Sequence, residues 1–429
     1  MKSFFPQLSI PNFSFNGVAR KLPPKGILTL LDQGIFSLGN FFTSVLIGRY
    51  CAKEELGLYL LGFTIIYFLM DAQSAFITTP YTIFIPRKAE AEKSVYTGNT
   101  LFMQFGLAFV IALGIFIFPI ILPASLLPEG MIPVLTSLAI VTVFLLLREY
   151  TRRLFFAQLK MKNALLLDVT IIVIQIILLV VLLYLQALSA TTAILMIGIT
   201  SGMVTIFWLY LDRNEIRFDR KLLRRDFNQC FQAGKWVFAS GFLWNIGTYL
   251  YPWLLTSFKG TAATGTWAAC LGIIALCNPV YLGLQNYLSP KIAHAYANNN
   301  KVDLRKFTIK STAAFAGLLG ICSVVLILFG GYFLVLLYGG KYAGNGIIIS
   351  LLAVNLMLVA AGFSFSRAFF TLERADVDFK VNIVSLVVLF TFGLWIIYNY
   401  GILGAALGLV AGNAIALMLR FGFFRRLLS

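Results

Sequence analysis

Long apolar runs recur along the whole chain and dominate its pattern. About 20 mostly apolar residues in helical form span the hydrocarbon core of a bilayer. The polar stretches between the runs are short, and none is long enough for a soluble domain. Twelve runs are predicted as spans: 27–48, 57–80, 98–121, 131–150, 164–186, 190–211, 236–257, 266–288, 311–329, 346–366, 380–399 and 402–424. The pattern predicts an all-α polytopic membrane protein.

The composition agrees with this class. The 429 residues are 59% hydrophobic and only 12% charged, with a mean hydropathy of +0.87. Soluble domains carry about 25% charged residues. The net charge of +17 would suit nucleic acid, but the basic residues are divided among many short loops. Nucleic-acid binding is therefore not expected.

The positions of the basic residues predict the topology. When the twelve spans alternate in direction, 30 of the 34 Lys and Arg residues fall on one side. The other side holds only Arg49, Lys53, Lys259 and Lys341. Basic residues accumulate in cytoplasmic loops, so both termini are predicted to be cytoplasmic. Residues 1–25 are expected to form a cytoplasmic tail without a cleavable signal peptide.

The longest polar stretch divides the chain into two halves with six spans each. We predict an N-lobe over 26–211, a cytoplasmic linker over 212–235 and a C-lobe over 236–429. A short internal similarity supports the division, because "GLYLLGF" (57–63) and "GTWAACL" (265–271) open the second span of each half. Transporters built from two repeated halves bind their substrate between them. A central cavity between the lobes is expected.

Polar side chains form ordered stripes inside several spans. At 100° per residue, Gln33 and Asn40 fall on one line of the first span, with Asp32 beside it. In the second span, Tyr67 and Asp71 lie on one face. A carboxylate at membrane depth costs roughly 2.5–3.5 kcal/mol, so it should face protein or water. The predicted cavity-lining residues are Gln33, Asn40, Tyr67, Gln175, Asn245, Asn278, Gln285 and Asn355.

Each stripe has a second interpretation. Amides and hydroxyls also hold a helix bundle together through hydrogen bonds between neighbouring helices. A carboxylate is harder to explain in this way, so Asp71, Asp32 and Asp168 are the candidates for binding a coupling ion.

Arginines near the ends of two spans are candidates for binding an anion. Arg148, Arg152 and Arg153 end the fourth span, and Arg367 ends the tenth. Guanidinium groups bind phosphate oxygens in pairs, so a cluster at a cavity mouth could hold a diphosphate. Alternatively these residues are cytoplasmic anchors, and Glu149 pairs with Arg152 or Arg153 along the helix.

Motifs of enzymes and cofactor sites are missing from the sequence. It has no zinc-binding His pair, no phosphate-binding loop and no G-x-S-x-G motif. The five cysteines are not placed to pair, because only Cys51 lies near the predicted outer side. We expect no catalytic residues, metal, cofactor or disulfide.

Three segments carry a resemblance to a known family: "LDQGIFSLGNFFTSVLIGRYCAKEELGLY" (31–59), "GTWAACLGIIALCNPVYLGLQNYLSPKIAHAYA" (265–297) and "LLYGGKY" (336–342). With the order of the twelve spans, they resemble the polysaccharide and O-antigen (Wzx-type) flippases of the multidrug/oligosaccharidyl-lipid/polysaccharide (MOP) exporter superfamily. The resemblance implies two six-helix lobes in the bacterial inner membrane. It also implies transport of undecaprenyl-diphosphate-linked oligosaccharides by alternating access, coupled to protons or sodium.

On that resemblance, Arg148 and Arg152 would suit the diphosphate, and Asp32 or Asp71 the coupling cation, with Asp71 preferred. A drug or cation antiporter of the same superfamily is the main alternative, because it would also use membrane carboxylates. A membrane-embedded enzyme is less favoured, because it should show a catalytic His or a large periplasmic loop, and a channel is a remote fourth. A two-lobe transporter encloses its own pathway, so a monomer is expected.

Overall fold

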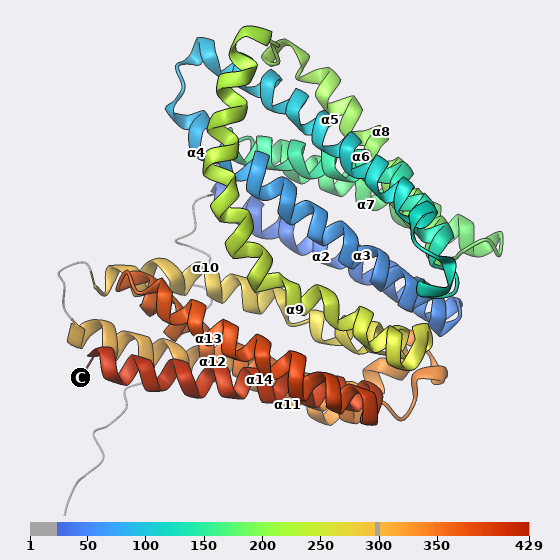
Figure 1. Cartoon of the computed structure of the whole chain (residues 1–429), viewed down its shortest axis with the longest axis vertical. Coiled ribbons are helices and arrows are strands. Elements are labelled where there is room, and N and C mark those ends of the chain that lie inside the picture. Colours follow the sequence, from blue (N-terminus) through green and yellow to red (C-terminus); the bar gives the residue numbers. More distant parts are fainter. Residues whose placement is uncertain (1–23, 297–300, 429) are drawn as a thin grey trace, which may run out of the picture.

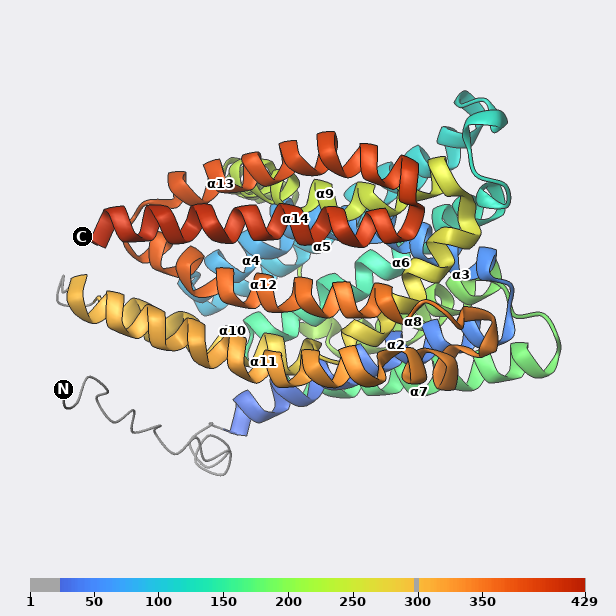
Figure 2. The ribbon, with the colours of Figure 1, turned by 90° about the horizontal axis from the view of Figure 1, so that it is seen from below.

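The structure is a computed structural model that describes residues 24–296 and 301–428. Helices are the regular elements of these ranges, and most run nearly parallel from one end of the molecule to the other (Figure 2). The first group is α2 (Pro24–Tyr50), α3 (Lys53–Gln73), α4 (Thr79–Phe84), α5 (Glu90–Ile121), α6 (Met131–Ala157), α7 (Met161–Tyr184) and α8 (Ala190–Leu211). The second is α9 (Arg220–Ala275), α10 (Asn278–His294), α11 (Lys301–Tyr338), α12 (Gly346–Thr371), α13 (Ala375–Val388) and α14 (Leu394–Leu428). Short 3₁₀ or π-helical segments, η1–η6, connect or interrupt them: Ser74–Thr78, Ile85–Arg87, Ala124–Leu126, Arg213–Glu215, Gly340–Tyr342 and Leu389–Gly393.

Two helices, α9 and α14, each extend over parts of two predicted spans. Gly260 breaks α9 and Gly401 breaks α14, with φ angles of 82° and 57°. Glycine adopts such angles without a steric penalty. These two breaks fall between predicted spans. The predicted span 266–288 is itself bent by 54° where α9 ends at Ala275 and α10 begins at Asn278, and the other predicted spans are largely helical. By length and composition alone, eight helices of the described residues could cross a membrane, or nine if one bent pair is one span.

The helices form two lobes, as predicted. Figure 1 shows α2–α8 in one group, the N-lobe, and the second half of α9 with α10–α14 in the other, the C-lobe. The two groups meet at one end and diverge toward the other, and the first half of α9 runs across the N-lobe. The predicted linker at 212–235 is largely helical, because α9 begins at Arg220. The start of α9 packs on the N-lobe, where Asn99 donates a hydrogen bond to buried Asp226 over 2.8 Å. The predicted tail, residues 1–25, lies almost entirely outside the described residues.

The lobes are held together at the end of the molecule that has few basic residues. Arg49 at the end of α2 donates a hydrogen bond to the carbonyl of Leu336 in α11. Lys341 donates back to the carbonyl of Cys51. Deeper in the same contact, the Ser44 and Tyr338 hydroxyls lie 3.1 Å apart. Leu336 lies in the last turn of α11 and Cys51 directly follows α2, so these carbonyls have no partner within their helices and accept the cations.

Two glycines from the internal repeat bring the lobes into backbone contact. A Cβ atom on Gly57 of α3 would lie 2.1 Å from the carbonyl oxygen of Thr261. A Cβ on Gly265 of α9 would lie 1.8 Å from the carbonyl oxygen of Lys53. Both distances are far below van der Waals contact, so only glycine permits this approach. The two segments that the repeat relates therefore pack against each other.

We predict that Gly265→Val opens this end of the molecule. The added side chain cannot fit beside Lys53, so the lobes must separate. Amide hydrogen exchange should then become several-fold faster in residues 44–57 and 336–342. Gly106→Val is the matched control, because a Cβ at Gly106 meets no atom within 4 Å. Equal exchange in the two variants would contradict the role given to this contact.

Candidate functional site

Asp71 joins the two lobes near the C-terminal end of α3. Its Oδ2 atom accepts hydrogen bonds from the Asn245 amide over 2.8 Å and from the Tyr249 hydroxyl over 2.7 Å. Both donors lie on α9, in the C-lobe. About two turns before Asp71 on α3, Thr64 accepts a hydrogen bond from the Trp253 indole over 2.9 Å. We call these five residues the inter-lobe site.

The inter-lobe site follows from the two helical patterns. Thr64 and Asp71 are seven residues apart on α3, and Asn245, Tyr249 and Trp253 are spaced by four on α9, so each set lies on one face. Asp71, from the polar stripe predicted for the second span, thus faces the other lobe. Asn245 was predicted, whereas Tyr249 and Trp253 were not. Their spacing from Asn245 was the available signal.

A cavity of about 370 Å³ lies beside the inter-lobe site, between α3 and α9. Its walls are mostly apolar and include several aromatic rings, with Phe68 from α3 and Phe238, Phe242 and Trp253 from α9. Asp71 is the only acidic or basic residue among the described residues that line it. In the described part of the chain, no Lys or Arg forms an ion pair with Asp71.

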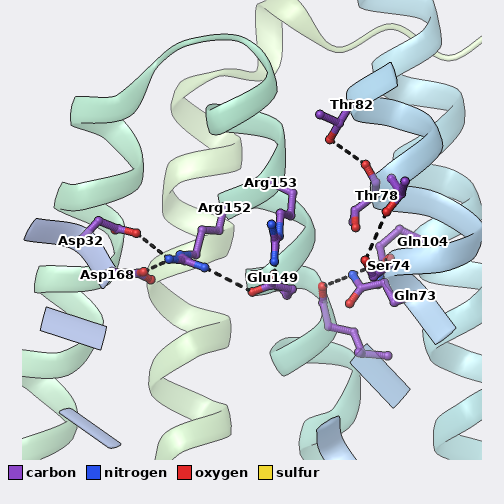
Figure 3. Close-up of polar contacts among 12 residues, drawn as sticks. Asp32, Gln73, Ser74, Thr78, Thr82, Gln104, Glu149, Arg152, Arg153 and Asp168 are labelled. Carbon is purple, nitrogen blue, oxygen red and sulfur yellow. Dashed lines mark hydrogen bonds and ion pairs between the residues drawn. The ribbon is translucent and has the colours of Figure 1, made fainter. Parts of the chain in front are cut away.

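Asp32 and Asp168 have a different environment, a buried ion-pair cluster inside the N-lobe. Arg152 lies 2.5 Å from Asp32 and 2.7 Å from Asp168 (Figure 3). Arg148 lies 2.8 Å from Asp168. All four side chains are less than a tenth exposed. The helices α2, α6 and α7 contribute them, so the cluster ties three spans of one lobe together.

Two further residues of α6, Glu149 and Arg153, form the rim of the cluster and complete its charge balance. Glu149 pairs with Arg153 over 2.7 Å along α6, which confirms one of the local pairs predicted from the sequence, and it lies 3.9 Å from Arg152 (Figure 3). With the rim included, three arginines face three carboxylates. The ring of Phe36 covers the guanidiniums of Arg148 and Arg152 at 4.8 and 5.3 Å. The structure therefore brings the diphosphate candidates of α6 together with two of the ion-coupling candidates, Asp32 and Asp168, in one neutral cluster, whereas Asp71 lies outside it.

Arg367 differs from the N-lobe arginines. Its side chain is exposed near the end of α12, between the rings of Phe363 and Phe370 at 5.1 and 5.7 Å. No carboxylate of the described residues lies within ion-pair distance of it. Nearby Arg374 is instead bonded to Asp376, and this hydrogen bond lowers the pKa of the Asp376 carboxyl to about 2.

The C-lobe holds a second buried charge cluster that the sequence analysis missed. Arg420 of α14 donates to Asp378 over 2.8 Å and to Asn382 over 2.9 Å. Ser366 of α12 donates to the other oxygen of Asp378 over 3.0 Å. Asp378 and Asn382 are one turn apart at the start of α13, which was the available signal.

The remaining predicted cavity-lining residues occupy varied places. Gln175 is buried and donates to Thr43 over 2.9 Å, and Asn413 donates to Asn355 over 2.8 Å, so both predicted residues bond between helices of one lobe. The other five predicted residues are half-buried or exposed: Gln33, Asn40, Tyr67, Asn278 and Gln285. Whether any of these residues contacts a substrate stays a prediction.

Comparison with known proteins identifies the family. A family model described as "Polysaccharide biosynthesis protein" matches residues 24–282, which is more than half of the chain. The chain belongs to this family. The capsular polysaccharide biosynthesis protein CapF of Staphylococcus aureus is 26% identical over 190 residues, 44% of this chain and 48% of CapF. The chain thus matches about half the length of that relative.

Solved structures show that the fold is that of MOP-superfamily transporters. An inward-facing multidrug resistance transporter of the MATE family matches with a TM-score of 0.73 at 16% identity, over 92% of this chain and 94% of that one. The lipid II flippase MurJ, in an inward closed conformation, matches with a TM-score of 0.71 at 14% identity, over 93% and 87%. A MOP transporter from Pyrococcus furiosus, reported with a binding pocket of reverse polarity, gives 0.66 at 16% identity over 94% of each chain. At these identities the likeness establishes the fold alone.

We predict that Arg152→Ala destabilises the protein strongly. The change leaves Asp32 and Asp168 buried with too few cations, which costs about 3–5 kcal/mol in the free energy of unfolding. Arg153→Ala is the control, because its exposed ion pair with Glu149 contributes about 0–1 kcal/mol. Equilibrium unfolding in mixed micelles measures both. Equal losses would mean that the buried cluster does not stabilise the lobe.

Proposed function

We propose that this protein moves undecaprenyl-diphosphate-linked oligosaccharide units across the bacterial inner membrane for surface polysaccharide synthesis. The observation that carries the proposal is the family match over residues 24–282, on a chain with the two-lobe fold of MOP transporters. The same family and fold favour a transporter rather than an enzyme. The substrate partners are the lipid-linked oligosaccharide, the surrounding lipids and a coupling proton or sodium ion.

The orientation in the membrane follows from the basic residues. The end where the lobes diverge carries most of the Lys and Arg residues, so we place it and both termini in the cytoplasm. The glycine contact at Gly57 and Gly265 then closes the outer side. The structure would represent an inward-open state, in which a substrate enters from the cytoplasmic leaflet.

Arg367 is our first candidate for the diphosphate. Its guanidinium is exposed and has no carboxylate partner among the described residues, so it can bind phosphate without first breaking an ion pair. Arg148, Arg152 and Arg153 are already neutralised by carboxylates. They would contribute only if the substrate displaced Asp168, Asp32 or Glu149.

Asp71 is our candidate for the coupling ion. Arginine balances the charges of Asp32 and Asp168, whereas Asp71 is held only by neutral donors of the other lobe. A proton or sodium ion on Asp71 would weaken its acceptance of the bonds from Asn245 and Tyr249. Because those bonds connect the lobes, ion binding would change the balance between conformations.

The test is a flipping assay in liposomes with a labelled prenyl-diphosphate oligosaccharide and an imposed ion gradient. Wild type should expose the label to an external enzyme in a gradient-dependent way. Asp71→Asn should lose the gradient dependence, and Asp376→Asn, which changes an exposed carboxylate, should keep it. Protein-dependent transport of cationic dyes without any flipping would instead favour the drug or cation antiporter.

We predict that Arg367→Ala weakens binding of a prenyl-diphosphate sugar to the purified protein by tenfold or more. A charge-assisted hydrogen bond to phosphate contributes about 1.5–3 kcal/mol, which corresponds to that loss. Arg374→Ala removes a neighbouring cation that is already bonded to Asp376, so its effect should be small. Calorimetric titration in micelles measures both. Unchanged affinity in Arg367→Ala would return this residue to the role of a membrane anchor.

A further inference from the structure

The cavity between α3 and α9 has the wrong chemistry for a phosphate. Its only ionisable acidic or basic group, among the described lining residues, is the Asp71 carboxylate, so its formal charge is negative. A diphosphate placed here would meet a like charge and no cation. The cavity therefore does not suit the headgroup of the proposed lipid-linked substrate.

The Asp71 carboxylate has an acceptor that the protein does not use. Asn245 and Tyr249 both donate to Oδ2. Within the described residues, the Oδ1 atom of Asp71 accepts no hydrogen bond. This atom is also not fully buried. Oδ1 is therefore reachable from the cavity. A carboxylate oxygen in this situation is stabilised by a cation that reaches it.

The walls of the cavity favour the same kind of ligand. Phe68, Phe238 and Phe242 form a contiguous group, with ring centroids 5.9–6.4 Å apart. Trp253 and Tyr249 complete the aromatic lining near Asp71. Aromatic faces attract cations through their negative quadrupole, and they also bury apolar groups. A volume of about 370 Å³ lies within the range of small-molecule sites.

We propose that this cavity is a binding site for an amphiphilic organic cation, with Asp71 as the counter-charge and the aromatic rings as the apolar enclosure. Phe242 and Val237, which line the cavity, are exposed, so such a ligand can enter past them. Because α3 and α9 belong to different lobes, an occupant contacts both and stabilises the conformation in which they meet. The proposal does not depend on the flippase assignment.

Tetraphenylphosphonium is the probe, measured by equilibrium binding of the radiolabelled cation to the full-length protein in nanodiscs without an ion gradient. Saturable binding to wild type is expected, with tetraphenylborate, an anion of the same shape, unable to displace it. Asp71→Asn should lower the affinity at least tenfold, whereas Asp376→Asn should leave it unchanged. Displacement by tetraphenylborate as effective as by the unlabelled cation would overturn the proposal.

A second variant tests the cavity without touching its charge. Gly241 lines the cavity, and a Cβ there meets no atom within 4 Å, so Gly241→Leu fills the space without displacing the protein. This variant should lose binding and keep its thermal unfolding temperature. Gly283→Leu, at a glycine of α10 that also faces open space but lies outside the cavity, is the control and should bind normally. Normal binding by a folded Gly241→Leu, or no saturable binding by wild type, would place the ligand elsewhere or nowhere.

Discussion

The cost of a charge at membrane depth constrains the whole molecule. An ionised side chain in hydrocarbon must be paired, bonded or exposed to water. The N-lobe meets this constraint with a neutral cluster in which Arg152 bridges Asp32 and Asp168. The C-lobe meets it with Arg420 on Asp378. Each cluster joins helices of a single lobe, so the two lobes are internally braced and can move as units.

Asp71 meets the same constraint in a different way. Its partners are neutral, and they come from the other lobe. A bond of this kind is weaker than a buried ion pair and changes when the carboxylate binds a cation. The internal clusters thus provide rigidity, whereas the inter-lobe site provides a contact that an ion or a ligand can alter. This difference is the physical basis for assigning coupling to Asp71 and stability to Asp32 and Asp168.

Much of the architecture could be predicted from the sequence, because it follows from local patterns. Apolar runs gave the twelve spans, and the spacing of Tyr67 and Asp71 gave the polar face of α3. The pair Glu149–Arg153 is one helical turn apart and was among the pairs expected. The partners of Arg152 were not expected, because Asp32 lies 120 residues away and no local pattern connects them. Likewise Arg420 and Asp378 are 42 residues apart. Such pairs depend on how the helices pack, which a single sequence does not encode in its spacing.

The central claim is that the lobes move against each other under the control of Asp71. It is tested most directly by distances between spin labels at Glu92 and Glu373, which are exposed on the N-lobe and the C-lobe at the end where the lobes diverge. Labels carried on unnatural amino acids leave the five native cysteines in place. The account predicts that a prenyl-diphosphate oligosaccharide with an ion gradient shortens the distance in wild type and not in Asp71→Asn. An unchanged distance in wild type, or the same shortening in both proteins, would contradict it.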